Sequence, residues 1–203
     1  IKPNYARCRW SFPPLAAHLN LEHFNRRTVT AAVYTNCDEA ELRVNGKKMG
    51  RRKPGDFANG IIEWTFEYTE GEVRVIGFLQ GKEVCAHTLK TAGPAQNIVL
   101  APDKTNLAAG GLDIAHVEVT VTDANGIPCP NGELLIEFAL KGDGEILGAC
   151  SPDLNAGLGF TLPKVLTSGG KALLMIRPGR AGTLELSAYS ETLDPASLQF
   201  TVR

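Results

Sequence analysis

The feature that most constrains the fold of this chain is the spacing of its apolar residues, which recur at every second position. Over residues 62–68, Ile, Trp, Phe and Tyr alternate with Glu and Thr, and over residues 117–122 Val alternates with Glu and Thr. A period of two is typical of strands, and turn signals such as Asn45-Gly46 follow at short intervals. Helical periodicity is nearly absent, so the sequence predicts an all-β chain of the β-sandwich type.

The length and one glycine- and proline-containing segment indicate two domains. A chain of 203 residues lies between one large domain and two ordinary ones. Residues 91–95 (TAGPA) separate two strand-rich halves, which is typical of a short interdomain junction. We therefore expect a lead-in over residues 1–14 and two tandem immunoglobulin-like β-sandwich domains, over residues 15–93 and 94–203.

Each predicted domain should have a hydrophobic core of its own. About seven strands are expected in the second half, and residues 150–170, which show little alternation, form its longest predicted loop. The residues expected to be buried are Val29, Val33, Leu42, Val44, Trp64 and Phe66 in the first domain, and Val117, Val119, Ile136, Phe138, Leu174, Leu186 and Phe200 in the second.

Charge and hydropathy exclude two classes of partner. The formal net charge is -1, and the basic runs are no longer than residues 47–48 and 51–53, so nucleic acid is not an expected partner. No stretch approaches the roughly 18–20 consecutive apolar residues that span a bilayer, so we expect no membrane insertion. Because the chain starts at Ile1 rather than Met, we expect it to be part of a longer polypeptide.

The five cysteines are expected to be unpaired. They are Cys8, Cys37, Cys85, Cys129 and Cys150, and none forms a CxxC pair or has zinc-site spacing to a histidine. Free cysteine is often a small buried hydrophobic residue. Nothing in the predicted strand order places any two of them close enough to form a disulfide bond.

Motifs for catalysis are absent from the sequence. There is no GxSxG elbow, HExxH motif or P-loop, and no GxGxxG opens a helix. A retaining glycosidase needs two carboxyl groups about 5–5.5 Å apart, and this chain has no βα units with which to build the barrel that normally holds them. We expect no catalytic residue and no cofactor within these residues.

The densest polar cluster in the sequence is residues 18–23 (HLNLEH). On an extended strand, His18, Asn20 and Glu22 would share one face and the two leucines the other. Such a face could hold a metal only with ligands from other segments, so no metal site is predicted. We interpret the segment as an edge strand whose polar face contacts a neighbouring domain.

Aromatic side chains are the candidates for stacking against sugar rings. Trp64 keeps step with the apolar face of its strand and is expected in the core. Phe57 lies in a loop flanked by Gly55 and Gly60, and Trp10 lies in the irregular lead-in. We therefore take Trp10 and Phe57 as the candidate carbohydrate-binding residues.

Particular strings in the first half resemble a known family. Residues 33–39 (VYTNCDE) and 41–47 (ELRVNGK) resemble the immunoglobulin-like domain that follows the catalytic barrel in many glycoside hydrolase family 2 β-galactosidases. Residues 18–22 (HLNLE) are similar to that family's HWNWE segment, with Leu19 and Leu21 in place of its tryptophans.

The second half resembles the last, invasin-like domain of the same enzymes. The matching strings include residues 102–105 (PDKT), 116–126 (HVEVTVTDANG), 144–148 (GEILG) and 181–188 (AGTLELSA). Residues 149–155 depart from the glycine- and asparagine-rich loop that is common there. The resemblance covers about residues 15–203, as two domains in the family's order.

The resemblance implies a non-catalytic C-terminal accessory region of a bacterial enzyme. Its implied partner is the upstream catalytic barrel of the same polypeptide, whose catalytic glutamates have no counterpart here. The periplasm or the cell exterior is the expected compartment of that enzyme. Two alternatives share the fold: a module that binds glycan through exposed aromatic residues, and an adhesin-type surface protein.

Overall fold

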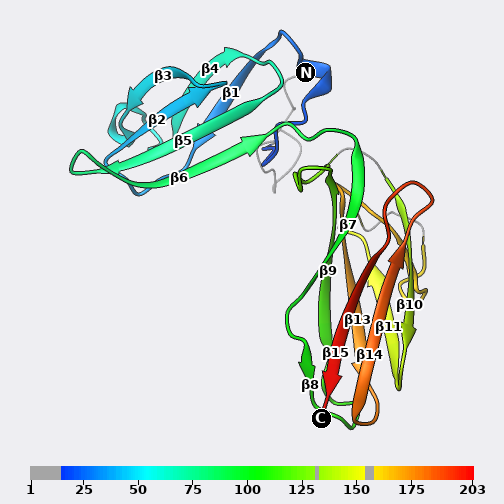
Figure 1. The fold of residues 1–203 in the computed structure, drawn as a ribbon. Coiled ribbons are helices and arrows are strands. Elements are labelled where there is room, and N and C mark those ends of the chain that lie inside the picture. The colour runs from blue at the N-terminus through cyan, green and yellow to red at the C-terminus, as the bar shows by residue number, and fades with distance from the viewer. Residues whose placement is uncertain (1–14, 131–132, 154–157) are drawn as a thin grey trace, which may run out of the picture. The chain divides into compact units, whose positions relative to one another are not determined.

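The computed structural model describes residues 15–130, 133–153 and 158–203, which divide into two compact units between residues 91 and 92 (Figure 1). The division falls two residues before the predicted junction at Gly93-Pro94. Apart from short 3-10 turns, the regular structure of the described residues consists of β-strands, so the predicted all-β class is confirmed.

The first unit is a β-sandwich of two antiparallel sheets of unequal width. The larger sheet has the strand order β3-β2-β5-β6, and the smaller one consists of β1 and β4. Two 3-10 turns, η2 (Glu22–Phe24) and η3 (Pro54–Asp56), complete the unit. The strands are β1 (Thr28–Val33), β2 (Glu39–Val44), β3 (Lys47–Arg52), β4 (Ile62–Glu67), β5 (Glu72–Leu79) and β6 (Lys82–Lys90).

Alternation along β4 accounts for the core of the first unit. Ile62, Trp64 and Phe66 are 0%, 1% and 8% exposed, and the residues between them are exposed. Leu42 from the facing sheet is fully buried, as predicted. Val29, Val33 and Val44, which were also expected in the core, are only half-buried against it.

Two tight turns have the backbone that their residues predict. Asn45 and Gly46 join β2 to β3 with φ of 49° and 79°, and Gln80 and Gly81 join β5 to β6 with φ of 51° and 77°. Positive φ at both central positions is the property of the type I′ hairpin, whose twist matches that of the flanking strands. The turn predicted at Asn45-Gly46 is confirmed.

The second unit is a wider sandwich of a five-stranded and a four-stranded sheet. Their strand orders are β12-β10-β14-β15-β8 and β11-β13-β9-β7, and the only parallel pair among them joins β15 to β8. The strands are β7 (Ala95–Pro102), β8 (Asn106–Leu107), β9 (Ala115–Asp123), β10 (Leu135–Lys141), β11 (Gly144–Cys150), β12 (Lys164–Leu166), β13 (Lys171–Pro178), β14 (Gly182–Tyr189) and β15 (Ala196–Val202).

The core of the second unit contains every residue that the sequence predicted for it. All seven are buried, from Phe138 at 6% exposed to Val117, Val119 and Ile136 at 0%. The strand count differs from the prediction because β8 and β12 are only two and three residues long. Short strands with no alternation of their own gave no signal, and β12 lies within the predicted loop.

The buried carboxylate of Asp123 organises the turn between β9 and residue 128. It accepts backbone hydrogen bonds from Asn125 and Ile127, both at 2.8 Å, and from Gly93 at 2.8 Å. The bond from Gly93, the strongest cause, keeps the pKa of Asp123 below its usual range. This side chain therefore anchors the beginning of the second unit to the β9 turn.

Candidate functional site: an apolar groove in the first unit

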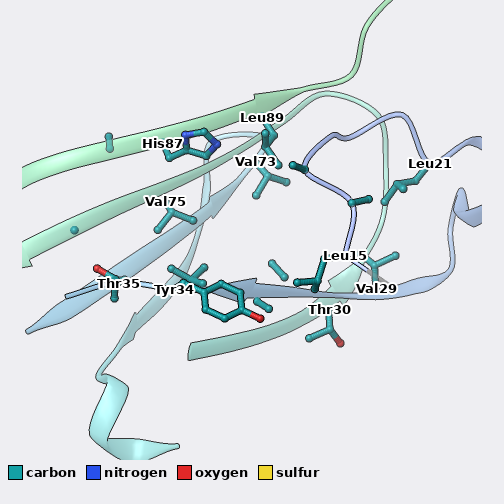
Figure 2. Close-up of a pocket in the computed structure, with 18 of the residues that line it drawn as sticks. Leu15, Leu21, Val29, Thr30, Tyr34, Thr35, Val73, Val75, His87 and Leu89 are labelled. Atoms are coloured by element: carbon teal, nitrogen blue, oxygen red, sulfur yellow. The ribbon is translucent and has the colours of Figure 1, made fainter. Parts of the chain in front are cut away.

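An open groove of about 1140 Å³ runs along one side of the first unit. Residues of β1, β5 and β6 line it, together with the segment that contains Leu15 and Leu21 (Figure 2). The groove follows from the unequal sheets, because two strands cannot cover the inner face of a four-stranded sheet. Among the described residues, no further strand covers the inner faces of β1 and β6.

The two long walls of the groove come from opposite sheets. Figure 2 shows Val29, Thr30 and Tyr34 along β1 and its end, and His87 and Leu89 along β6. Val29 pairs with Phe66 and His87 pairs with Val75, which places both on the faces that point into the sandwich. The half-buried state of Val29 and Val33 therefore reflects a core that is open on this side.

The lining of the groove is apolar apart from a few polar groups. They are the hydroxyls of Tyr34 and three threonines, the Cys85 thiol and the His87 imidazole; the described lining contains no carboxylate. Paired carboxyl groups are the chemistry of glycoside hydrolysis. The groove can therefore bury an apolar partner but cannot supply that pair of groups.

Strand β6 presents an unusual amount of surface for a strand rich in apolar residues. Every residue of β6 except Leu89 is exposed, and Val84 is 51% exposed. The strand lies at the edge of its sheet, so one row of its backbone groups has no partner strand within the described residues. Exposed apolar edges are prone to pair with other chains unless something covers them.

Glu41, Arg43 and Arg51 form a charged cluster on the larger sheet. Glu41 is 5% exposed, and its Oε1 accepts hydrogen bonds from the Arg43 guanidinium at 2.7 and 2.8 Å. These bonds hold the pKa of Glu41 below its usual range. Arg51, which contacts the carboxylate at 3.5 Å, lowers this pKa further. Glu41 is ionised at neutral pH, so it could not act as a general acid.

The predicted strand through His18, Asn20 and Glu22 is wrong. Residues 15–21 form no strand, and Glu22 begins the η2 turn. The prediction that the two leucines share an inward face is partly correct, because Leu19 is buried and Leu21 packs against the core. The backbone of this segment bonds to a side chain instead of a neighbouring strand: the Tyr68 hydroxyl donates to the Leu19 carbonyl at 2.6 Å.

The polar side chains of the same segment remain candidates for contact with a neighbouring domain. His18 and Asn20 are half-buried and Glu22 is exposed. Their contact with a neighbouring domain stays a prediction.

The two candidate carbohydrate-binding aromatics have different outcomes. Trp10 lies outside the described residues. Phe57 is half-buried against the core of the first unit, and the Arg52 guanidinium lies 6.0 Å from its ring centroid. One face of Phe57 is thus already occupied by protein, and its role in sugar binding stays a prediction.

The cysteines differ from expectation in one respect. Cys37, Cys85, Cys129 and Cys150 are free thiols, but the Sγ atoms of Cys37 and Cys85 lie only 3.8 Å apart. The strand order predicted from the sequence places no two cysteines this close. The signal that it missed is three-dimensional, because the contact depends on Gly77 between them.

Residues 15–130, 133–153 and 158–203 hold neither a cluster of metal ligands nor a membrane-spanning helix. No three His, Cys, Asp or Glu side chains there converge as metal ligands would. Nor does this part of the chain contain a helix long and apolar enough to cross a membrane.

Comparison with protein families matches both halves of the chain. Residues 98–199, just over half of the sequence, match the model described as glycoside hydrolase family 2 C-terminal domain 5. Residues 27–85 match a domain of unknown function, DUF4982. The two matches fall in separate compact units.

Curated relatives include enzymes that are much longer than this chain. A β-galactosidase of Bacteroides ovatus, BoGH2A, is 35% identical over 169 residues, which is 83% of this chain but 20% of that enzyme. A β-galactosidase of Thermoanaerobacter pseudethanolicus is 30% identical over 157 residues, 70% of this chain and 21% of that enzyme. The chain thus spans about a fifth of the length of the relatives it matches.

Solved structures with the same fold include a member of this family. A glycosyl hydrolase family 2 member from Bacteroides cellulosilyticus has a TM-score of 0.91 at 28% identity, over 96% of this chain and 25% of that one. A β-glycosidase from Bacteroides vulgatus has the same fold, with a TM-score of 0.86 at 24% identity, over 92% of this chain and 24% of that one. The chain belongs to glycoside hydrolase family 2 and corresponds to the C-terminal region of its members.

Proposed function

We propose that these residues support an upstream catalytic barrel of the same polypeptide, and that the whole enzyme hydrolyses β-galactosidic bonds. One observation carries the proposal: the chain matches about a fifth of the length of two β-galactosidases, in a region whose family model is named for its C-terminal position. The described groove offers no carboxylate, so the reaction is assigned to the remainder of the polypeptide.

The groove of the first unit is the surface we assign to contact with that barrel. Leu15, Ala16 and Ala17 line the groove, so the polypeptide enters the first unit beside it. Whatever precedes these residues in the full-length enzyme is therefore tethered close to the groove. An apolar surface of this size in contact with water favours burial, and the absence of carboxylate, lysine and arginine side chains from the lining fits a protein partner.

The assignment of catalysis is tested with the isolated chain and with the full-length polypeptide that carries it. We expect an aryl β-galactoside to be hydrolysed by the full-length protein and not by residues 1–203. Deleting residues 15–203 should lower the melting temperature of the remaining enzyme. Turnover by the isolated chain that disappears when one of its own Glu or Asp residues is replaced would show that the assignment is wrong.

The groove contact is tested with two neighbouring substitutions on β6. His87→Glu places a charge in the groove, whereas Thr88→Glu changes the adjacent side chain, which does not line it. Both positions are exposed, so both variants of the isolated chain should melt like the unmodified chain. In the full-length enzyme, His87→Glu should lower the melting temperature and speed proteolysis between barrel and accessory region; equal effects of the two substitutions would exclude the groove.

Carbohydrate binding is the alternative function for this accessory region, and the isolated chain tests it. Retention of the isolated chain on an immobilised β-galactan, lost on Phe57→Ala, would favour a glycan-binding module over a support for the barrel.

A further inference from the structure

Two cysteines on different segments of the first unit lie in contact. Cys37 is buried in the connection that precedes β2, and Cys85 is exposed on β6 and lines the groove. Their Sγ atoms are 3.8 Å apart although the residues are 48 positions apart in the sequence. A disulfide bond requires about 2.05 Å between sulfurs, so closing the gap takes a movement of about 1.8 Å.

The strand register explains why these two sulfurs meet. Gly77 on β5 pairs with Ala40 of β2 on one side and with Cys85 of β6 on the other. A Cβ atom at Gly77 would lie 2.7 Å from the Sγ atoms of both Cys37 and Cys85. The missing side chain of Gly77 therefore creates the space in which the two thiols touch.

We propose that Cys37 and Cys85 form a redox-active dithiol, which a small-molecule disulfide converts into an intramolecular disulfide bond. The Cys85 thiolate attacks one sulfur of the small molecule and releases the first thiol. The Cys37 thiolate then attacks Sγ of Cys85 and releases the second. Both cysteines are oxidised, the external disulfide is reduced to two thiols, and these take the two cysteine protons.

The order of the two steps follows from exposure. Cys85 is open to solvent through the groove, whereas Cys37 is 6% exposed and can react only with a sulfur already beside it. The hydrogen bond with Cys37, followed by desolvation, raises the pKa of Cys85. Exchange should accordingly be measured at mildly alkaline pH, where more of this thiol is ionised.

The disulfide bond would restrict the movement of two segments that border the groove. It would tie the exposed edge strand β6 to the connection between β1 and β2, which borders the groove through Tyr34 and Thr35. Closing a loop of this length restricts the unfolded chain far more than the folded one. The oxidised form should therefore unfold at a higher temperature, by about 10 °C or more, in the transition of the first unit.

Glutathione disulfide is a suitable probe, and the reduced 203-residue chain is the sample. After incubation, remaining thiols are alkylated and the protein is digested and mapped by mass spectrometry. We expect a peptide pair linked through Cys37 and Cys85, with Cys129 and Cys150 alkylated, and reversal by dithiothreitol. A stable glutathione adduct on Cys85 with Cys37 alkylated, or a link from Cys37 to another cysteine, would overturn the proposal.

Two variants separate the dithiol from a merely reactive thiol. Cys85→Ala should leave Cys37 unmodified and abolish the rise in melting temperature. Gly77→Ala keeps both thiols, and the variant should fold because the backbone at Gly77 is not in the left-handed region. The added Cβ pushes the two sulfurs apart, so formation of the disulfide bond should slow by on the order of tenfold. Closure at the normal rate in folded Gly77→Ala would contradict the geometric argument. The proposal concerns the 203-residue chain, in which Cys85 is exposed, so its test does not depend on the proposed contact between the groove and the barrel.

Discussion

Replacement of Phe138 by alanine tests whether the two units are stable independently. Phe138 is 6% exposed and belongs to the core cluster of the second unit, whereas the core of the first unit contains none of the same residues. Truncating a buried phenylalanine costs about 3–5 kcal/mol, a large part of the roughly 5–15 kcal/mol that stabilises a domain. At about 4 °C or more per kcal/mol, the second unit should melt some 12–20 °C lower.

Calorimetry should resolve the change as a shift of one transition. The first unit should keep its melting temperature, and limited proteolysis at an intermediate temperature should release a resistant fragment that ends near residue 91. Leu135→Ala is the matched control, because this residue lies on the same strand but is 41% exposed and should change stability little. Loss of both units in one transition, without a resistant N-terminal fragment, would refute the reasoning.

Three smaller predictions concern single contacts. Tyr68→Phe removes the hydroxyl that bonds to the Leu19 carbonyl, so it should cost the first unit about 1 kcal/mol and speed amide exchange in residues 15–21. Because the folded-state pKa of Asp123 is lowered, its carboxylate stabilises the second unit above the unfolded value of about 3.9, and this contribution is lost as pH falls through the folded pKa. The melting temperatures of wild type and Asp123→Asn should therefore differ at pH 7 and converge below about pH 4; a constant gap would contradict this. Gly170→Ala should destabilise the second unit more than Gly169→Ala, because both have positive φ but only a Cβ at Gly170 meets a backbone carbonyl oxygen, at 2.1 Å; equal losses in thermal denaturation would contradict this.

The sequence predicts the fold well wherever a strand has one buried and one exposed face. The alternation of Ile62, Trp64 and Phe66 with polar residues predicts β4, because every second side chain of this strand is buried in the core. The same rule failed at residues 18–22, where Leu19 is buried as expected but its carbonyl bonds to Tyr68. A pattern of side-chain burial does not specify what the backbone groups bond to, so it cannot distinguish a strand from an anchored loop.

The candidate site was beyond sequence reasoning for a different reason. The groove exists because the smaller sheet has two strands and the larger has four, and strand counts per sheet depend on pairing between distant segments. The contact between Cys37 and Cys85 likewise needs three segments and a glycine in the middle one. Periodicity is a local property of the sequence, so it carries no information about contacts between distant segments.

The position of β15 in its sheet has a consequence for how the protein is made on the ribosome. This strand, residues 196–202, lies between β14 and β8, so the five-stranded sheet stays split until residues 196–202 have been synthesised. The first unit ends at residue 91, so it can close while the 111 residues from 92 to 202 are still to be added. At about 5–20 residues per second, it has roughly 6–22 s to fold before the second unit can. During that interval the nascent second half exposes β9, β10 and β13, so a stalled or truncated product of this chain should be bound by chaperones through its C-terminal half.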